Sequence, residues 1–493
     1  MDESLEFLKL LDFPEEEIPV LLPVWKRACA VLHLSEQDLR FAREEWLPQY
    51  WDLHLRGVRK CIAAYIRELI EVTKLSDYKA CGDKIIYYNM PCHPPCIYAH
   101  KRSGGKRIHI CYPDYIIATV FSAFFHKTAS NRGNGPCASP LCHQCEMNQF
   151  KVNKEFRDLL PEPDVLWNWG LYCNEGHKIE ELAAETEDRD WFCVLTTMPP
   201  DATPGMDERE DQRRVEYLVA ELRDAQKRIG ERTGIPVSDG DLIDATEEYL
   251  AYQMKIEELA YLVSKAACQP IGGNDMAIFQ APAQIAFGTG LKWLSEALDT
   301  LLEEVKARIA EGIGPLPADA PRLACHFVPF SVPWINRAFM DNGVNLSVNT
   351  FFALASEQQH YFDRNDIYRS AARQWLCNPS AVGMLNEADL VCEILQRYPV
   401  DGVLYGFFDF SCWIGSLKKT LIKIVEARTG IPHYYFESEF WNDEQYSLDD
   451  RIARIRSIAY RVKINHLLGG WKHGTKKDIE RQDTDYRGSA TPD

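Results

Sequence analysis

The stretch Asp401-Gly-Val-Leu-Tyr-Gly-Phe-Phe-Asp-Phe-Ser-Cys412 is followed by Trp-Ile-Gly-Ser and then by a helical pattern. A second stretch, Asp164-Val-Leu-Trp-Asn-Trp-Gly-Leu-Tyr-Cys173, is followed by Asn-Glu-Gly-His and another helical pattern. Each stretch predicts an apolar strand, a short loop with one cysteine, and a helix. Strands that alternate with helices form mostly parallel sheets, so the repeated pattern predicts an α/β fold.

Around these stretches the 493-residue chain divides into five segments, and its length alone predicts two or three domains. Residues 1–85 show helical spacing of apolar residues. Residues 86–205 alternate short β-rich runs with Pro, Gly and Cys clusters, which predicts a first α/β domain. Residues 206–315 are strongly helical, residues 316–470 return to the α/β pattern, and residues 471–493 form a polar tail.

The second α/β domain shows the clearest alternation. We expect strands over residues 322–330, 344–348, 402–408 and 433–436, with helices between them over residues 334–342, 386–398 and 413–429. In open parallel sheets the ligand lies in the crevice at the carboxyl ends of the strands, where Cys173 and Cys412 would both sit. A helix N-terminus next to each cysteine would stabilise a thiolate or an anionic cluster.

The charge balance excludes one class of partner. Lys and Arg total 55 against 73 Asp and Glu, which gives a net charge of −18. A nucleic-acid backbone requires a basic face, so we expect no nucleic-acid partner. No run of about 18 apolar residues occurs and the N-terminus is acidic, unlike that of a secretory signal. We therefore expect a cytoplasmic protein without a membrane partner.

One local cluster of positive charge stands out against this acidic background. It comprises Lys101, Arg102, Lys106 and Arg107, separated by Ser-Gly-Gly. The cluster is typical of a solvated turn, and it is also suited to hold phosphates such as those of CoA. No Walker-type loop, G-x-G-x-x-G fingerprint or nucleophile elbow occurs, so any ATP hydrolysis that the reaction requires would come from another polypeptide.

Sixteen cysteines in a chain without a signal sequence indicate metal binding beyond ordinary core packing. Cys137-Ala-Ser-Pro-Leu-Cys142-His-Gln-Cys145 has spacings that suit an iron–sulfur cluster or zinc. Upstream lies Cys92-His-Pro-Pro-Cys96. A structural zinc site formed by Cys92, Cys96, Cys142 and Cys145 is the alternative to a catalytic cluster.

Taken together, these motifs resemble the family of 2-hydroxyacyl-CoA dehydratase and benzoyl-CoA reductase subunits, of the 2-hydroxyglutaryl-CoA dehydratase D-component type. The resemblance covers roughly residues 110–468. Besides the stretches that end at Cys173 and Cys412, it rests on Leu141-Cys-His-Gln-Cys145, Glu303-Glu-Val-Lys-Ala-Arg308, Gly312-Ile-Gly-Pro315, Val332-Pro-Trp-Ile-Asn-Arg337, Gly430-Ile-Pro-His433 and Glu437.

The resemblance implies two flavodoxin-like parallel-sheet domains with a helical N-terminal extension and a helical middle segment. It also implies a four-iron, four-sulfur cluster held by Cys173, Cys412 and either Cys142 or Cys145, with the fourth iron open. Family members pair with a homologous second subunit and accept electrons from a separate ATP-hydrolysing iron–sulfur activator.

The expected reaction is radical chemistry on an acyl-CoA thioester, in which an open iron would stabilise a ketyl radical anion. The segment from Val332 to Arg337 favours benzoyl-CoA-reductase-like reduction of an aromatic acyl-CoA. Dehydration of a 2-hydroxyacyl-CoA is the alternative within the family, and a non-catalytic zinc-stapled or electron-relay subunit is the alternative outside it. His143 and His177 are the candidate proton donors, by their proximity in sequence to the cysteines.

Overall fold

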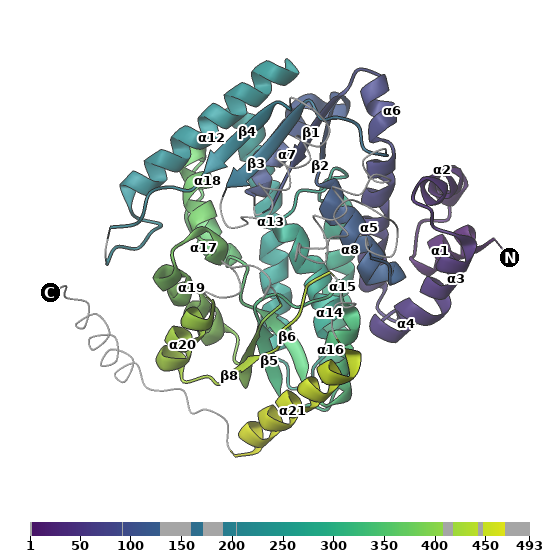
Figure 1. The fold of residues 1–493 in the computed structure, drawn as a ribbon, viewed down its shortest axis with the longest axis vertical. Coiled ribbons are helices and arrows are strands. Elements are labelled where there is room, and N and C mark those ends of the chain that lie inside the picture. Colours follow the sequence, from purple (N-terminus) through teal and green to yellow (C-terminus); the bar gives the residue numbers. More distant parts are fainter. Residues whose placement is uncertain are drawn as a thin grey trace.

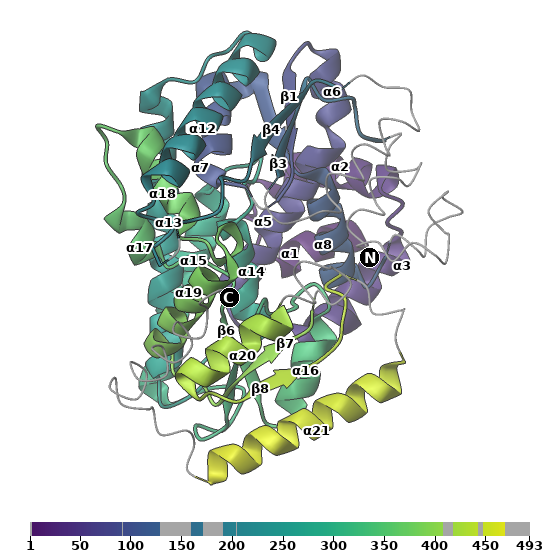
Figure 2. The ribbon, with the colours of Figure 1, turned by 60° about the vertical axis from the view of Figure 1, so that its left-hand side comes forward.

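The computed structural model describes residues 2–90, 92–128, 159–170, 191–203, 205–407, 418–441 and 447–468. Within these ranges the chain forms a mixed α/β fold with two four-stranded parallel sheets (Figure 1). The sheets lie at opposite ends of the long axis, and helices from the middle of the chain lie between them (Figures 1 and 2). This architecture is consistent with two flavodoxin-like domains, as the sequence predicts.

The first sheet has the order β2-β1-β3-β4. Its strands are β1 (Lys84–Tyr88), β2 (Ile108–Cys111), β3 (Val165–Gly170) and β4 (Cys193–Thr197). All neighbouring strands are parallel, with Ile86 opposite both Ile110 and Val165. The central strands β1 and β3 are buried because helices cover the sheet, as is typical of parallel sheets.

The second sheet repeats this topology with the order β6-β5-β7-β8. Its strands are β5 (Arg322–Cys325), β6 (Asn345–Asn349), β7 (Gly402–Tyr405) and β8 (His433–Tyr435). The register between β5 and β6 shifts between Leu323 and Ala324, and β7 pairs with β5 and β8 without a shift. In both sheets the first strand is therefore flanked by the second on one side and the third on the other.

Helices precede the first sheet. They are α1 (Glu3–Leu10), α2 (Ile18–Val31), α3 (Glu36–Phe41), α4 (Leu47–Tyr50), α5 (Arg56–Thr73) and α6 (Leu75–Ala80), with a π-helix at Ala42–Trp46. One apolar face of α5 is fully buried, and it packs along α15 (Lys292–Glu311). A Cβ at Gly57 would lie 2.6 Å from the Leu301 backbone nitrogen, so this close crossing requires glycine.

The middle of the chain supplies α12 (Gln212–Thr233), α13 (Asp239–Lys265), α14 (Gly273–Gln280) and α15, with a 3₁₀ turn at Ala281–Ala283. Ser238 is the N-cap of α13 and forms a capping box with Asp241. Gly312 ends α15 with φ +69°, a left-handed conformation that favours glycine.

The remaining helices surround the two sheets. On the first sheet they are α7 (Pro94–Gly104), which is followed by a 3₁₀ turn at Gly105–Arg107, and α8 (Pro113–Phe125). Those after β5 are α16 (Pro333–Asp341), α17 (Ala355–His360), α18 (Ile367–Leu376), α19 (Met384–Arg397), α20 (Lys418–Thr429) and α21 (Leu448–Leu467), with a 3₁₀ turn at Pro379–Ala381. The last helix, α21, lies along the outside of the second sheet (Figure 2).

Two features differ from the expectation for individual elements. The strand expected over residues 322–330 ends at Cys325 because Phe327 has φ +66°, which turns the chain out of the sheet. The sequence patterns did not single out β2, β4 or α18, each of which is short. The domain boundaries stay a prediction, although β2–β4 fall within the first expected α/β segment, β1 begins two residues before it, and β5–β8 fall within the second.

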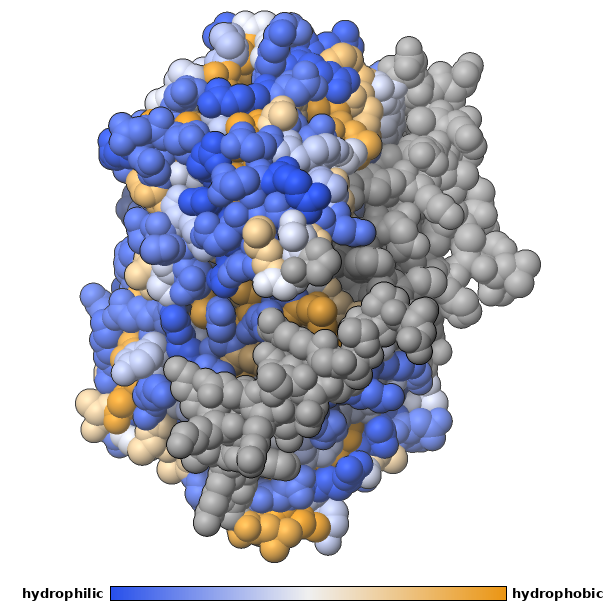
Figure 3. All heavy atoms as spheres, turned by 90° about the vertical axis from the view of Figure 1, so that its left-hand side faces the viewer, coloured by the Kyte–Doolittle hydropathy of each residue, from blue (hydrophilic) through white to orange (hydrophobic). Residues whose placement is uncertain are grey.

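No single helix among the described residues has the length and apolar character to cross a membrane, and one bent pair, Ile18–Val31 with Glu36–Tyr50, passes that test jointly. Hydrophilic side chains dominate the described part of the face shown in Figure 3, and apolar side chains occur there in small groups.

Candidate functional site

The carboxyl ends of the two sheets face each other across the segment that follows α14. The hydroxyl of Tyr88, the last residue of β1, donates to the Ala286 carbonyl at 2.5 Å. The Gln284 side chain donates to the Phe351 carbonyl, just beyond β6, at 3.2 Å. Residues 281–286 therefore connect the carboxyl edge of the first sheet with that of the second.

Further contacts near these edges join the two halves of the chain. The Trp169 ring, at the end of β3, lies 5.5 Å from the Trp375 ring of α18. The Trp441 indole, beyond β8, donates to the Thr119 hydroxyl of α8 at 3.1 Å. Because both edges are held by buried contacts, a ligand between them would touch residues from both halves of the chain.

The order of the strands reverses between β1 and β3 and between β5 and β7. Parallel sheets bind ligands at such switch points, outside the carboxyl ends of the strands. The two loops that carry cysteines leave these strands: Cys173 follows β3 and Cys412 follows β7. Gly406 begins the second loop with φ +119°, and a Cβ there would lie 2.2 Å from the Phe436 carbonyl oxygen. The described ends of both strands thus start the two cysteine loops at facing switch points.

The cluster ligands and proton donors expected from the sequence lie outside the described residues. These are Cys142, His143, Cys145, Cys173, His177 and Cys412. Within the described ranges, no group of three or more His, Cys, Asp or Glu side chains has an arrangement that could hold a metal ion. The expected ligand set therefore stays a prediction, and only its flanking strands can be placed.

Cys92 and Cys96 lie beyond β1 and at the start of α7, and both are buried. The Cys92 thiol donates to the Gln284 carbonyl at 3.4 Å, and Cys96 Sγ lies 3.4 Å from Nδ1 of His93. Burial raises the pKa of both thiols, so they remain protonated at neutral pH. The zinc alternative also requires Cys142 and Cys145, which lie outside the described residues, so it stays a prediction.

The basic cluster lies at the other end of α7. Lys101 and Arg102 belong to its last turn, and Lys106 and Arg107 come directly before β2, at the amino edge of the first sheet. Arg102 forms ion pairs with Asp244 at 3.0 Å and with Glu248 on α13. A role for this cluster in binding CoA phosphates stays a prediction, and the phosphates would lie at the amino edge of the first sheet.

The structure adds residues at the second switch point that the sequence patterns did not single out. His326 follows the last residue of β5, is only 3% exposed, and neither of its ring nitrogens has a hydrogen-bond partner within the described ranges. Burial, with the nearby Lys418, lowers the pKa of His326 far below its usual value, so the imidazole is neutral. A polar residue directly after the apolar run of β5 was the signal that could have drawn attention to it.

The backbone next to His326 is strained. Phe327 has φ +66°, which costs about 1–3 kcal/mol for a bulky residue and is typical of functional sites. The conformation directs its ring onto Phe351 at 4.2 Å and towards Phe440 at 5.4 Å. These rings give the second switch point an apolar wall.

A buried ion pair lies beside the same switch point. Lys418, at the start of the described part of α20, pairs with Glu387 of α19, and both side chains are almost fully buried. Burial lowers the pKa of Lys418 and raises that of Glu387, while their mutual attraction opposes both shifts. The pair places one positive and one negative charge beside the second switch point.

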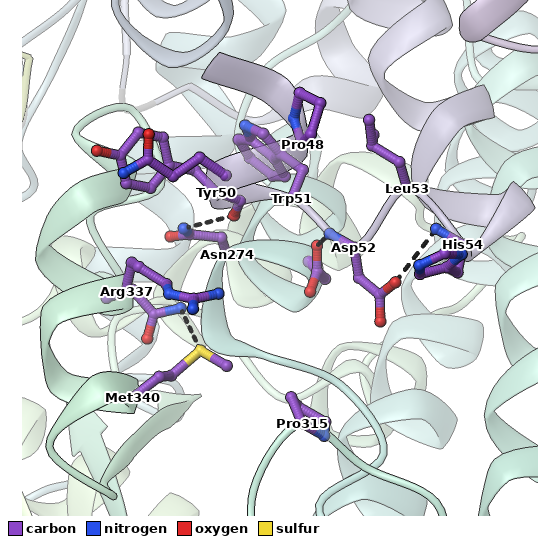
Figure 4. Close-up of a pocket in the computed structure, with 13 residues that line it drawn as sticks. Pro48, Tyr50, Trp51, Asp52, Leu53, His54, Asn274, Pro315, Arg337 and Met340 are labelled. Atoms are coloured by element: carbon purple, nitrogen blue, oxygen red, sulfur yellow. Dashed lines mark hydrogen bonds between the residues drawn. The ribbon is translucent and has the colours of Figure 1, made fainter. Parts of the chain in front are cut away.

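A cavity of about 400 Å³ lies away from these edges, between α4, α14 and α16 (Figure 4). Asp275 lines it and accepts a hydrogen bond from the Asp52 backbone N–H at 3.1 Å, while the Asp52 carboxylate pairs with Arg308 at 2.6 Å. Through these two contacts, Asp52 links the segment after α4 to α14 and to α15.

Comparison with known proteins adds one finding. A family model described as 2-hydroxyglutaryl-CoA dehydratase, D-component, matches residues 142–455. The matched residues begin at the expected ligand Cys142 and include the whole second sheet, whereas β1 and β2 lie before them. No curated protein matches the chain.

Proposed function

The chain belongs to the 2-hydroxyglutaryl-CoA dehydratase D-component family, and on that premise we propose that it is the iron–sulfur subunit of an acyl-CoA radical enzyme. It is a 2-hydroxyacyl-CoA dehydratase-type subunit. The observation that carries the finer proposal is the arrangement of the two sheets. Both carboxyl edges face the segment at residues 281–286, and each edge begins a loop with one expected cluster ligand.

The described surroundings suit a cluster of low potential. Phe407, the last described residue before the Cys412 loop, is 1% exposed and packs 6.1 Å from the Phe436 ring. Apolar, water-poor surroundings tune the potential of an iron–sulfur cluster. Cys173, Cys412 and either Cys142 or Cys145 would hold the cluster, which supplies a low-potential electron and an open Lewis-acidic iron.

The chain's own residues would exclude water and fix the position of the acyl group. The wall formed by Phe327, Phe351 and Phe440 presents apolar surface at the second switch point. The neutral imidazole of His326 adds a polar group without a net charge. Such surroundings strengthen every electrostatic interaction made with a developing charge on the thioester oxygen.

Within this function we favour removal of water from a 2-hydroxyacyl-CoA, because the matching family is a dehydratase component. Reduction of an aromatic acyl-CoA is the second candidate. It is favoured by the benzoyl-CoA-reductase-like segment Val332-Pro-Trp-Ile-Asn-Arg337, which begins α16 after β5. A homologous second subunit and a separate ATP-hydrolysing activator complete the enzyme that we propose.

The proposal is tested by the metal and acid-labile sulfide content of protein purified without oxygen. We expect about four iron and four sulfide per chain, and their loss in Cys412→Ala. Cys392→Ala is the matched control, because Cys392 is buried in α19 outside the expected ligand set and its loss should leave the cluster intact. Zinc without sulfide in the unmodified protein would contradict the proposal.

The reaction is then identified by incubating the complex, with activator and ATP, with a 2-hydroxyacyl-CoA and with benzoyl-CoA. Formation of an enoyl-CoA without net consumption of electrons identifies the dehydratase. Net electron consumption with loss of aromatic absorbance identifies the reductase.

A further inference from the structure

Three polar aromatic rings form a ladder across the second sheet. His326 follows β5, Tyr405 is the last residue of β7, and His433 is the first residue of β8. The rings of His326 and Tyr405 lie 6.0 Å apart and 17° from parallel, and those of Tyr405 and His433 lie 5.5 Å apart and 25° from parallel. We call these three residues the ring ladder.

The register of the sheet explains the ladder. Cys325 pairs with Leu404, so His326 and Tyr405 project to the same face. His433 pairs with Val403, two residues before Tyr405, and therefore shares that face. Since β8 is the edge strand, the ladder runs from the edge of the sheet to the carboxyl end of its central strand.

The polar atoms of the ring ladder lack hydrogen-bond partners. The covering helices α19 and α20 present apolar side chains such as Val391 and Val425. Neither His326 nor His433 has a partner for a ring nitrogen in the described parts of the chain, and the Tyr405 hydroxyl has none either. Buried polar groups are nearly always paired, with protein or with ordered water, so three adjacent exceptions require an explanation.

We propose that the ring ladder, with water molecules between its rings, carries protons from the edge strand to the carboxyl edge where the acyl group is transformed. The inference rests on the proposed function, because a hydroxyl that leaves as water and a ring that is reduced both require a proton at that edge. As one proton enters at His433, one leaves from His326. Each relay group keeps its net charge, each imidazole is left with its proton on the other nitrogen until the groups reorient, and no electron moves.

The neutral imidazoles and the exposure of His433 are consistent with proton transfer from His433 towards His326. Burial lowers the pKa of His433 to about 4 and that of His326 further, so both rings are neutral and can accept a proton on one nitrogen and donate from the other. His433 is partly exposed, whereas Tyr405 and His326 are buried. The charged groups near the ladder are Lys418, which acts on His326, and Glu387, which acts on Tyr405.

Tyr405→Phe tests the inference with little risk to folding, because it removes only a buried hydroxyl that lacks a partner. With histidine labelled by ¹⁵N, we expect exchange of the His326 ring N–H with solvent to slow by about tenfold or more. Acyl-CoA turnover should fall by about 10- to 100-fold with a larger solvent isotope effect, while acyl-CoA affinity and cluster content stay unchanged. His433→Phe should have the same effects from the outer end.

Tyr434→Phe is the matched control. Tyr434 neighbours the ladder on β8 but projects to the opposite face, and its hydroxyl accepts from the Asn465 amide at 2.8 Å. Unchanged exchange of His326 in Tyr405→Phe would overturn the inference. Slowed exchange in a protein that lacks both cluster and acyl-CoA turnover would preserve the proton path and reject the proposed function.

Discussion

At the scale of single residues, buried carboxyl groups show how position controls chemistry. Asp275 lines the cavity between α4, α14 and α16, and burial raises its pKa to about 7, although the hydrogen bond from the Asp52 backbone N–H lowers it. Glu68 is a second case, because burial raises its pKa to about 7 although it accepts from the backbone N–H groups of Gly288 and Thr289. Both carboxyl groups join segments distant in sequence.

Asp275 makes stability depend on pH. Its folded pKa lies above the unfolded value, so the folded state retains a proton over the range from pH 3.8 to about 7 in which the unfolded state has lost it. Stability therefore falls as pH rises through that range. Asp275→Asn should remove this dependence. Between pH 4 and 7.5 the free energy of unfolding of the variant, relative to that of the original protein, should therefore rise by about 1–4 kcal/mol.

Urea unfolding of both proteins at the two pH values measures this difference. Asp341→Asn is the control, because Asp341 is exposed and pairs only with Arg337 within α16. Parallel pH profiles for Asp275→Asn and the original protein would show that the Asp275 carboxyl ionises normally.

At the scale of elements, packing and intrinsic helix propensity make opposite predictions at Gly57. Alanine is favoured over glycine inside a helix by up to about 1 kcal/mol. A Cβ at Gly57, however, would lie 2.6 Å from Leu301, where α5 crosses α15. We expect Gly57→Ala to destabilise the protein by about 1–3 kcal/mol.

The matched control is Gly240→Ala in the first turn of α13. There a Cβ would meet only the Ser238 hydroxyl at 3.6 Å, so the substitution should be neutral or stabilising. Thermal unfolding of the two variants checks the prediction, and an equal shift in both would contradict the packing argument.

Elements also show where sequence patterns succeed. The helices expected over residues 334–342 and 386–398 agree with α16 and α19 to within two residues. The capping box at Ser238 and the glycine at the end of α15 mark helix ends through local chemistry. The early end of β5 was not predicted, since Val328 and Phe330 continue an apolar run. The strained backbone at Phe327 interrupts that run, and the rings of Phe351 and Phe440 pack against its side chain.

At the scale of the whole molecule, Gln284 connects the two switch points. Its carbonyl accepts from Cys92 and its side chain donates to the Phe351 carbonyl, and 3% of the residue is exposed. Gln284→Ala would leave the buried Phe351 carbonyl without its donor. We therefore expect the free energy of unfolding to fall by about 1–3 kcal/mol. Denaturant unfolding measures it, with the exposed Gln359→Ala as a control that should change stability little.

The sequence by itself determined the alternation of strands and helices, the placement of Cys173 and Cys412 after strands, and the family resemblance that the comparison confirms. These properties are local, because periodicity and short motifs depend on neighbours along the chain. Only the tertiary structure decided that the two carboxyl edges face each other and that Cys92 is buried. It also decided that His326, Tyr405 and His433 stack across three strands. Those contacts join residues far apart in sequence, and they form only when the whole chain packs.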